Sequence, residues 1–430
     1  MTPPRRVGLV TCASLVVANM VGTGIFTSLG FQLAEITSPP VILLLWALGG
    51  VLALCGALCY AELSAALPRS GGEYHFLGRI YHPSLGFMGG LVSLVVGFAA
   101  PVALSAMAFG SYLQGLFPAI SPQAASVAVV VIVTLFHLGD LRLSSIFQIV
   151  FTFLKIGLIV FLCLTLLSSP SSDFISVESW GKHIFSAPFA VSLMFTLYAY
   201  SGWNAATYIL DEVRTPARVI PRALIIGTLL VTVLYLVLNY AFLQAAPTEK
   251  MVGQLNVAQV AAQAVLGSEG GRLVAAVIAL GLISAISAMI WAGTRVALVI
   301  GEDYPKAFGW LQKRNRCGIP AVAVISQSTL TLGLLLTSSF EQVLIYAQFA
   351  LLACGFLTVF GVIVLRFTQP NLPRPFRVPF YPVTPILFLG ISAFTMAYSA
   401  AERPIEALFG GLTLLAGLIV YQVVGARKHP

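Results

Sequence analysis

Apolar stretches recur twelve times along this sequence, each long enough to cross the hydrocarbon core of a bilayer, which needs about 20 helical residues. A helix suits each stretch, because in lipid it satisfies its own backbone hydrogen bonds. We therefore predict an all-α membrane protein with a single transmembrane domain over residues 1–430. A charged fraction of only 9% excludes an ordinary soluble globular protein. The twelve predicted transmembrane helices cover residues 7–29, 39–66, 84–113, 123–140, 143–167, 184–210, 221–245, 271–300, 319–337, 340–367, 381–399 and 403–425.

The basic residues predict the orientation of these helices, because Lys and Arg gather in cytoplasmic loops. With both termini in the cytoplasm, all but five of the 23 basic residues fall on the inner side. Lys155 lies within a span, and the outer side carries only Lys182, Lys250, Arg272 and Arg403. Membrane orientation therefore explains the net charge of +8, and we predict no nucleic-acid partner.

Two of the predicted helices contain short interruptions that carry glycine. The first is Val21-Gly22-Thr23-Gly24-Ile25 in span one, and the second is Tyr200-Ser201-Gly202-Trp203-Asn204 in span six. Broken helices are tolerated where they line a protein-enclosed cavity, and a matched pair is typical of the binding site of a secondary transporter. Spans five apart cross the membrane in opposite directions. This predicts an inverted repeat of residues 1–167 against residues 184–367, followed by two additional helices in residues 381–425.

The two interruptions offer complementary backbone chemistry. A new helix begins at Gly22-Thr23-Gly24, and its free N–H groups suit a carboxylate. Unwinding at Tyr200-Ser201-Gly202 frees carbonyl oxygens, which suit an ammonium group. Together they fit the zwitterionic end of an α-amino acid. Glycines also allow close packing of membrane helices, but the matched second break favours a site at the first. We interpret three other glycine pairs as close-packing positions only: Gly49-Gly50, Gly89-Gly90 and Gly410-Gly411.

Six motifs stand in order along the chain, each in its expected place: Gly22–Phe26, Tyr60–Leu63, Pro68–Tyr74, Ala199–Asn204, Asp211–Val213 and Pro221–Ala223. This ordered set resembles the amino acid-polyamine-organocation (APC) transporters, and more narrowly their L-amino acid transporter (LAT) branch, over most of the first ten helices. The resemblance implies a LeuT-like fold with a 5+5 inverted repeat and broken helices 1 and 6. It also implies amino acid transport by alternating access, often as exchange.

The resemblance further implies a set of substrate-binding residues around the two breaks. The substrate carboxylate is expected to meet the backbone of Thr23, Gly24 and Ile25, and the ammonium is expected to meet carbonyl groups beside both breaks. The predicted substrate-binding residues are Met20, Val21, Gly22, Thr23, Gly24, Ile25, Tyr198, Ala199, Ser201 and Gly202.

Three residues of the second break are expected to gate or brace the site. Tyr198 matches the aromatic gate of the family, which closes over the substrate from outside; the alternative is packing at the membrane interface, which Tyr favours. Trp203 and Asn204 follow the break and are expected to brace the unwound segment rather than to touch substrate.

Lys155 is the basic residue placed well inside a predicted span, and ionisable residues at that depth are functional by default. The resemblance implies that Lys155 points at the unwound part of helix one and at helix eight, where sodium-coupled relatives of the fold hold a cation. We expect Ser287 to be its partner in helix eight and transport to be sodium-independent. The alternative is a lysine that snorkels toward the cytoplasm.

The substrate is predicted to be a small neutral L-amino acid. No acidic residue falls within the predicted pocket segments of helices one, three, six, eight and ten, so a cationic side chain would meet only aromatic faces. Ser201 stands where relatives often have glycine, which narrows the pocket. Four acidic residues near cytoplasmic helix ends are expected to form structural ion pairs with neighbouring arginines: Glu62, Glu73, Asp211 and Glu212. The alternative is a proton-coupled transporter of cationic amino acids or polyamines.

The sequence predicts no enzyme, metal site or cofactor. Its five histidines are scattered without a catalytic partner pattern, and a channel would not need matched broken helices. The six cysteines give no disulfide framework, and the outer loop from Gln114 to Gln123 contains none, so we expect no disulfide-linked accessory subunit. These features fit a multi-pass protein of the bacterial inner (plasma) membrane, whose partners are the lipid bilayer and a small-molecule L-amino acid.

Overall fold

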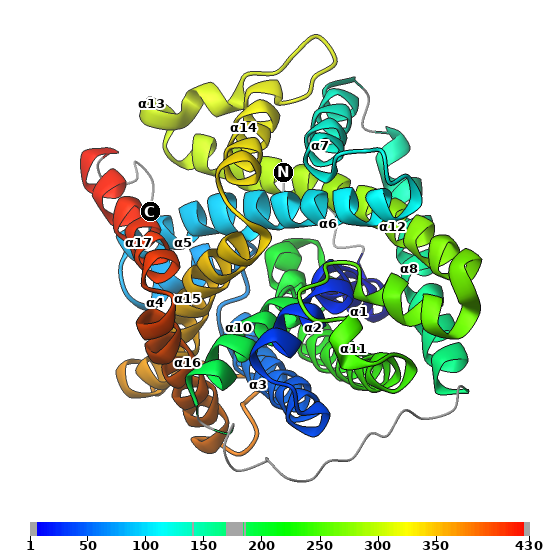
Figure 1. Cartoon of the computed structure of the whole chain (residues 1–430). Coiled ribbons are helices and arrows are strands. Elements are labelled where there is room, and N and C mark those ends of the chain that lie inside the picture. Colours follow the sequence, from blue (N-terminus) through cyan, green and yellow to red (C-terminus); the bar gives the residue numbers. More distant parts are fainter. Residues whose placement is uncertain (1–6, 140–141, 169–183, 185, 425–430) are drawn as a thin grey trace.

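The computed structural model describes residues 7–139, 142–168, 184 and 186–424. These residues form a bundle of helices (Figure 1), and their isolated β-bridge joins Val7 to Val213. The first half of the chain contains α1 (Leu9–Met20), α2 (Gly24–Glu35), α3 (Pro39–Ala66), α4 (Gly72–Ile80), α5 (Pro83–Val92), the π-helical η1 (Ser93–Ala99), α6 (Ala100–Leu116), α7 (Pro122–Gly139) and α8 (Arg142–Leu167). The second half contains α10 (Ala187–Tyr200), η2 (Ala205–Glu212), α11 (Pro216–Ala245), η3 (Thr248–Lys250), α12 (Val257–Asp303), α13 (Pro305–Phe308), η4 (Gly309–Gln312), α14 (Ala321–Thr337), α15 (Phe340–Thr368), α16 (Val383–Glu402) and α17 (Pro404–Val424).

Nine segments of the described chain are long and apolar enough to cross a membrane, which makes this an all-helical, multi-pass membrane protein. The other three predicted spans, at 143–167, 184–210 and 319–337, fall on α8, on α10 with η2, and on α14. Two of these helices are short, with 14 residues in α10 and 17 in α14. The count of twelve and the inverted repeat of 1–167 against 184–367 stay predictions. The nine segments are Leu9–Glu35, Pro39–Ala66, Pro83–Leu116, Pro122–Gly139, Pro216–Ala245, Val257–Asp303, Phe340–Thr368, Val383–Glu402 and Pro404–Val424.

Both predicted interruptions are present as breaks between helices. The first helix ends at Met20 and α2 begins at Gly24, and likewise α10 ends at Tyr200 and η2 begins at Ala205. Gly202 adopts a φ of 97°, a conformation that side chains with a Cβ rarely accept. The two breaks lie close together, because α2 packs along α10.

The helices around the breaks form two packed groups (Figure 1). One group consists of α1, α2, α3, α10 and α11, with α11 packed against both α1 and α3. The other contains α6, α7, α12 and α14, where α12 lies along α6 and is flanked on its other side by α8. The breaks belong to the first group, and so the second group can form the opposite wall of a cavity.

A buried polar network fixes the helices next to the breaks. Gln32 of α2 is fully buried; its Nε2 donates to the carbonyl of Ser192 at 3.0 Å and to Thr196 Oγ1 at 2.6 Å, both in α10. Its Oε1 accepts from the indole N–H of Trp46 in α3 at 2.9 Å. A buried amide left without partners would be costly. The satisfied network therefore holds α2, α3 and α10 in one register.

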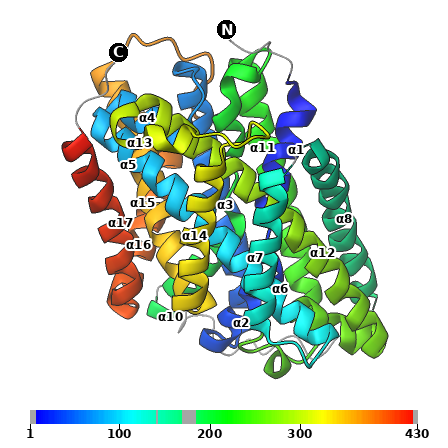
Figure 2. The ribbon, with the colours of Figure 1, turned by 90° about the horizontal axis from the view of Figure 1, so that it is seen from above.

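The positions of the chain termini and of the loops between helices can be compared with the predicted membrane topology. Figure 2 shows that α1 begins and α17 ends toward the same end, although which side of the membrane this is stays a prediction. Residues 246–270, which join the predicted spans 221–245 and 271–300 as an outer loop, are partly helical, because α12 already begins at Val257 and is interrupted at Gly267, which has a φ of 72°. The other long predicted outer loop, 168–183, and Lys182 within it lie almost wholly outside the described residues.

Candidate functional site

A cavity of about 1210 Å³ extends from the two breaks to one end of the bundle. Gly22, Thr23, Tyr198 and Ser201 line it at the breaks. Its other end is lined by α4, η2 and the end of α12, close to the point where Val7 pairs with the chain beyond Glu212. This is the end at which α1 begins (Figure 2). The volume exceeds that of an amino acid, so the cavity can hold a substrate and water together.

Free backbone N–H groups occur at the first break, as predicted. The hydrogen bonds of this segment run from Val21 N to Val17 O at 2.9 Å, from Gly22 N to Met20 O at 2.8 Å, and from Phe26 N to Thr23 O at 3.1 Å. Within the described structure the N–H groups of residues 23–25 take no part in such bonds, and Thr23 Oγ1 lies 2.7 Å from Ser105 Oγ instead of capping the helix. The start of α2 therefore offers unpaired donors with a partial positive charge.

The carbonyl groups of the first break are already engaged. Met20 O accepts from the hydroxyl of Tyr235 at 2.6 Å, and Val21 O accepts from Lys155 Nζ at 3.0 Å. Val21 and Ile25 are also 1% and 0% exposed and do not belong to the cavity wall. Val21 turns its carbonyl toward Lys155 of α8. Ile25 packs its side chain in the core, which leaves only its backbone N–H to meet a carboxylate, and the contact of both residues with substrate stays a prediction. The other eight predicted residues do line the cavity: Met20, Gly22, Thr23, Gly24, Tyr198, Ala199, Ser201 and Gly202.

Lys155 lies between the first break and α12. Its side chain is buried, and its ammonium donates to Val21 O. A Cβ built on Gly281 of α12 would stand 3.0 Å from Lys155 Cγ, so the aliphatic stem passes directly over that glycine. Snorkelling to the membrane surface does not describe this arrangement. The part that Lys155 takes in transport stays a prediction.

Ser287 does not meet Lys155 as expected. Its Oγ lies 2.8 Å from Nε2 of His137, a buried residue in the last turn of α7. Ser287 follows Gly281 by six positions, and at 3.6 residues per turn this places the two residues on different faces of α12. The face toward α8 thus carries Gly281, and the face toward α7 carries Ser287.

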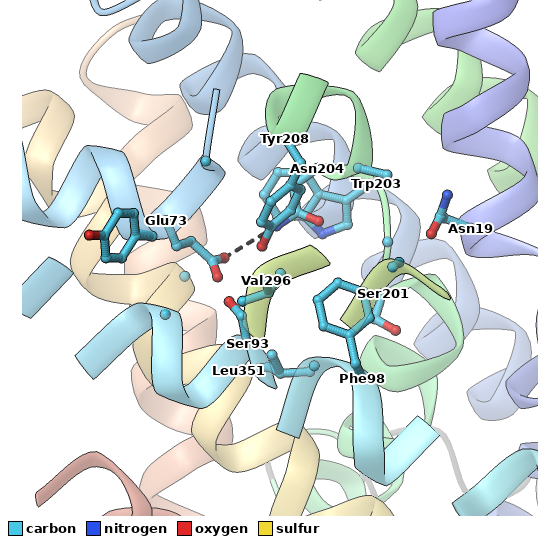
Figure 3. Close-up of a pocket in the computed structure, with 18 of the residues that line it drawn as sticks. Asn19, Glu73, Ser93, Phe98, Ser201, Trp203, Asn204, Tyr208, Val296 and Leu351 are labelled. Carbon is cyan, nitrogen blue, oxygen red and sulfur yellow. Dashed lines mark hydrogen bonds between the residues drawn. The ribbon is translucent and has the colours of Figure 1, made fainter. Parts of the chain in front are cut away.

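The residues of the second break hold it in place. The ring of Trp203 meets that of Tyr60 edge-on at 4.7 Å and also packs over Gly56, where a Cβ would lie 2.7 Å from the indole. Asn204 Nδ2 donates to Glu73 Oε1 at 3.2 Å (Figure 3). These contacts agree with the expected bracing of the unwound segment, although both residues also line the cavity.

Glu73 is a cavity residue that the sequence analysis missed. It is 5% exposed, and its Oε1 accepts from the hydroxyl of Tyr60 at 2.7 Å as well as from Asn204. The expected ion pair with an arginine is wrong for Glu73. The signal lay in Gly71-Gly72, whose positive φ values of 122° and 53° turn α4 back along the cavity.

The expected ion pairing holds for Glu62. Its carboxylate pairs with Arg366 of α15 at 2.6 Å and with Arg374 at 3.4 Å, and it accepts from Val378 N at 2.7 Å. Asp211 instead accepts a hydrogen bond from Ser70 N at 3.2 Å, so its carboxylate is held by a neutral backbone group rather than by an arginine. These contacts join the segments at the open end of the cavity.

Comparison with known proteins identifies the family. A family model described as amino acid permease matches residues 7–416. The chain belongs to this family, which lies within the APC superfamily. The family is made up of transporters rather than enzymes.

Individual relatives of this permease are similar to it over nearly the whole length of this chain. The b(0,+)-type amino acid transporter 1 of Mus musculus is 29% identical over 430 residues, which are 97% of this chain and 87% of that protein. The large neutral amino acids transporter small subunit 2 of Homo sapiens is 27% identical over 432 residues, 97% of this chain and 80% of that protein. The serine/threonine exchanger SteT of Bacillus subtilis (strain 168) is 27% identical over 431 residues, 99% of this chain and 98% of that protein.

Proposed function

We propose that this permease moves small neutral L-amino acids across a bacterial inner membrane by alternating access, as a sodium-independent exchanger. The observation that carries the proposal is the pair of broken helices at one end of the cavity. The unpaired N–H groups of residues 23–25 fit a carboxylate, and Ser201 brings a hydroxyl and the neighbouring carbonyls to the same space. No charged side chain is needed to hold the zwitterion.

The side chain of the substrate would face a small space. Ser201 and Phe98 both line the cavity (Figure 3), and Tyr198 is a buried member of the same wall. Bulk at these positions favours alanine or serine over tryptophan. The similarity to the serine/threonine exchanger SteT, which covers 99% of this chain, supports the same class of substrate.

The orientation that we propose places both termini in the cytoplasm. The cavity would then open inward, since it reaches the end of the bundle where α1 begins. On the closed side, α2 packs against the loop after η3, where Gly253 N donates to Gly30 O at 2.8 Å. The proposed outer loops contain no cysteine and would offer no thiol for an accessory subunit, since five cysteines are buried and Cys317 lies beyond η4 near α14.

Glu73 favours a second candidate, a transporter of cationic amino acids. It places a carboxyl group on the cavity wall, where the sequence had predicted no acidic residue. A lysine or arginine side chain could reach for it while the α-amino acid end occupies the breaks. We prefer the neutral substrate because Glu73 is already held by Tyr60 and Asn204, and a cation would have to displace them.

Uptake into proteoliposomes separates the two candidates. Vesicles loaded with unlabelled serine are expected to take up labelled serine faster than empty vesicles, with no gain from a sodium gradient. Unlabelled alanine should compete better than arginine or tryptophan. Competition by arginine at lower concentration than alanine would favour the cationic substrate, and uptake that rises several-fold with sodium would overturn sodium independence.

A further inference from the structure

The carboxyl group of Glu73 is held by neutral donors from three different elements. The hydroxyl of Tyr60 in α3 donates at 2.7 Å, and the amide of Asn204, in the turn after α10, donates at 3.2 Å. The hydroxyl of Tyr208 in η2 is its third hydrogen-bonding neighbour. None of these groups can neutralise a carboxylate, although each stabilises one.

No cation pairs with Glu73 among the residues that the structure describes, although Arg69, Arg79 and Arg295 line the same cavity. The titratable groups that face it are Tyr60 from α3, Tyr208 from η2 and Cys354 from α15, and the facing residue of α5 is Gly89. Burial is the largest influence on this carboxyl and raises its pKa, while the three hydrogen bonds oppose that shift. Glu73 lies in α4, outside the candidate spans.

The local backbone is built to bring Glu73 to this place. Gly71 and Gly72 both have positive φ, and a Cβ on Gly72 would lie 2.8 Å from the ring of Tyr208. The two glycines therefore let α4 approach η2 closely. Because Glu73 also lines the open cavity (Figure 3), water can deliver a proton to it and carry one away.

We propose that Glu73 is a proton-binding site whose occupancy sets how firmly α4 holds the second break. An ionised Glu73 accepts charge-assisted hydrogen bonds, which are about twice as strong as neutral ones. Protonation removes that charge and weakens the bond from Asn204, which follows the Ser201–Gly202 turn by two residues. The proton comes from water in the cavity and returns to it, so no other reactant is required. The coupling to substrate rests on the proposed amino acid transport.

Infrared difference spectroscopy tests the site without relying on transport. Spectra of the purified protein in lipid at about pH 5 and about pH 8 should contain a carbonyl band from a protonated carboxyl group that titrates. This band is expected to be lost in Glu73→Gln and kept in Glu402→Gln, a control at an exposed position. An unchanged band in Glu73→Gln would overturn the proposal. A band that shifts on adding lysine or sodium at fixed pH would instead identify a cation site and would also overturn it.

The pH profile of exchange tests the consequence. With equal pH on both sides of the membrane, the unmodified protein should change its serine exchange rate across this range, and Glu73→Gln should lose that dependence. Glu73→Asp keeps a carboxyl group, so its serine exchange should still depend on pH, with the dependence shifted along the pH axis. This variant also tests the proposal if Glu73→Gln does not fold. A Glu73→Asp band that does not titrate, or a Glu73→Gln profile like that of the unmodified protein, would contradict the proposal. Absence of serine exchange in the unmodified protein at every pH would count against the proposed function and leave the infrared result to decide the proton site.

Discussion

The two breaks are supported in opposite ways. At the first, side chains from other helices reach in: Lys155 binds the carbonyl of Val21, and Tyr235 binds that of Met20. At the second, side chains of the break reach out, with Trp203 on Tyr60 and Asn204 on Glu73. The first break is thus held through its backbone, and the second is held through its own side chains.

This difference has consequences for motion and for mutation. A backbone carbonyl held by a buried lysine keeps its place as long as α1 and α8 stay together. A break that depends on Asn204 and Trp203 can be released by changes at the open end of the cavity, where their partners in α3 and α4 lie. We therefore expect the first break to act as the fixed half of the site and the second as the movable half.

Removing Lys155 should weaken the support of the first break strongly. Lys155→Ala leaves the carbonyl of Val21 without its charged donor, and such a hydrogen bond contributes about 1.5–3 kcal/mol. We expect serine exchange to fall about tenfold or more, with a smaller loss of thermal stability in detergent.

Lys155→Met is the matched control, since it keeps an unbranched stem over Gly281 and loses only the charge. An equal loss of exchange in the Ala and Met variants would assign the effect to the ammonium group. Full activity in both would show that the first break does not need this contact.

Alanine substitutions at Gly24 and Gly22 distinguish the effect of helix packing from that of substrate contact at the first break. A Cβ on Gly24 would lie 2.5 Å from Cα of Ala199, so Gly24→Ala should destabilise the protein by about 1–3 kcal/mol and abolish exchange. A Cβ on Gly22 has Met20 O as its nearest neighbour at 3.9 Å. Gly22→Ala should therefore leave the melting temperature unchanged and raise the KM for serine. If both variants melted like the unmodified protein, the close approach of α2 and α10 would not limit stability.

A substitution at Asn204 tests whether the second break is the movable half of the site. Asn204→Ala removes one hydrogen bond to Glu73, worth about 1 kcal/mol or somewhat more. We expect a change of about fivefold in the exchange rate, together with faster amide hydrogen exchange at residues 201–204. Unaltered protection of that segment would indicate that Trp203 alone holds the break.

The sequence predicted the features that depend on local composition and missed those that depend on packing. The breaks at Gly22–Gly24 and Ser201–Gly202 were predictable because glycines inside an apolar span stand out along the chain. Glu73 was assigned to a helix end, since Gly71-Gly72 marks a turn in the sequence but does not show that α4 runs back along the cavity. Ser287 was paired with Lys155 because the sequence indicates how deep each residue lies in its helix, but not which face of α12 turns toward α8. The structure shows that Gly281 lies on the face toward α8 and that Ser287 lies on the face toward α7.

The smallest expected effect concerns Ser201, which lines the cavity together with Phe98 (Figure 3). Ser201→Gly removes a hydroxymethyl group and keeps the backbone carbonyl that we assign to the ammonium. A pocket enlarged by about one such group changes discrimination by about 1–3 kcal/mol at most. We expect larger neutral amino acids such as leucine to compete better for uptake, while serine exchange changes little. This outcome would place the substrate side chain beside the movable break. A variant whose competition profile matches that of the unmodified protein would move the side-chain pocket elsewhere in the cavity, and a loss of serine exchange itself would show that the hydroxyl of Ser201 holds the substrate directly.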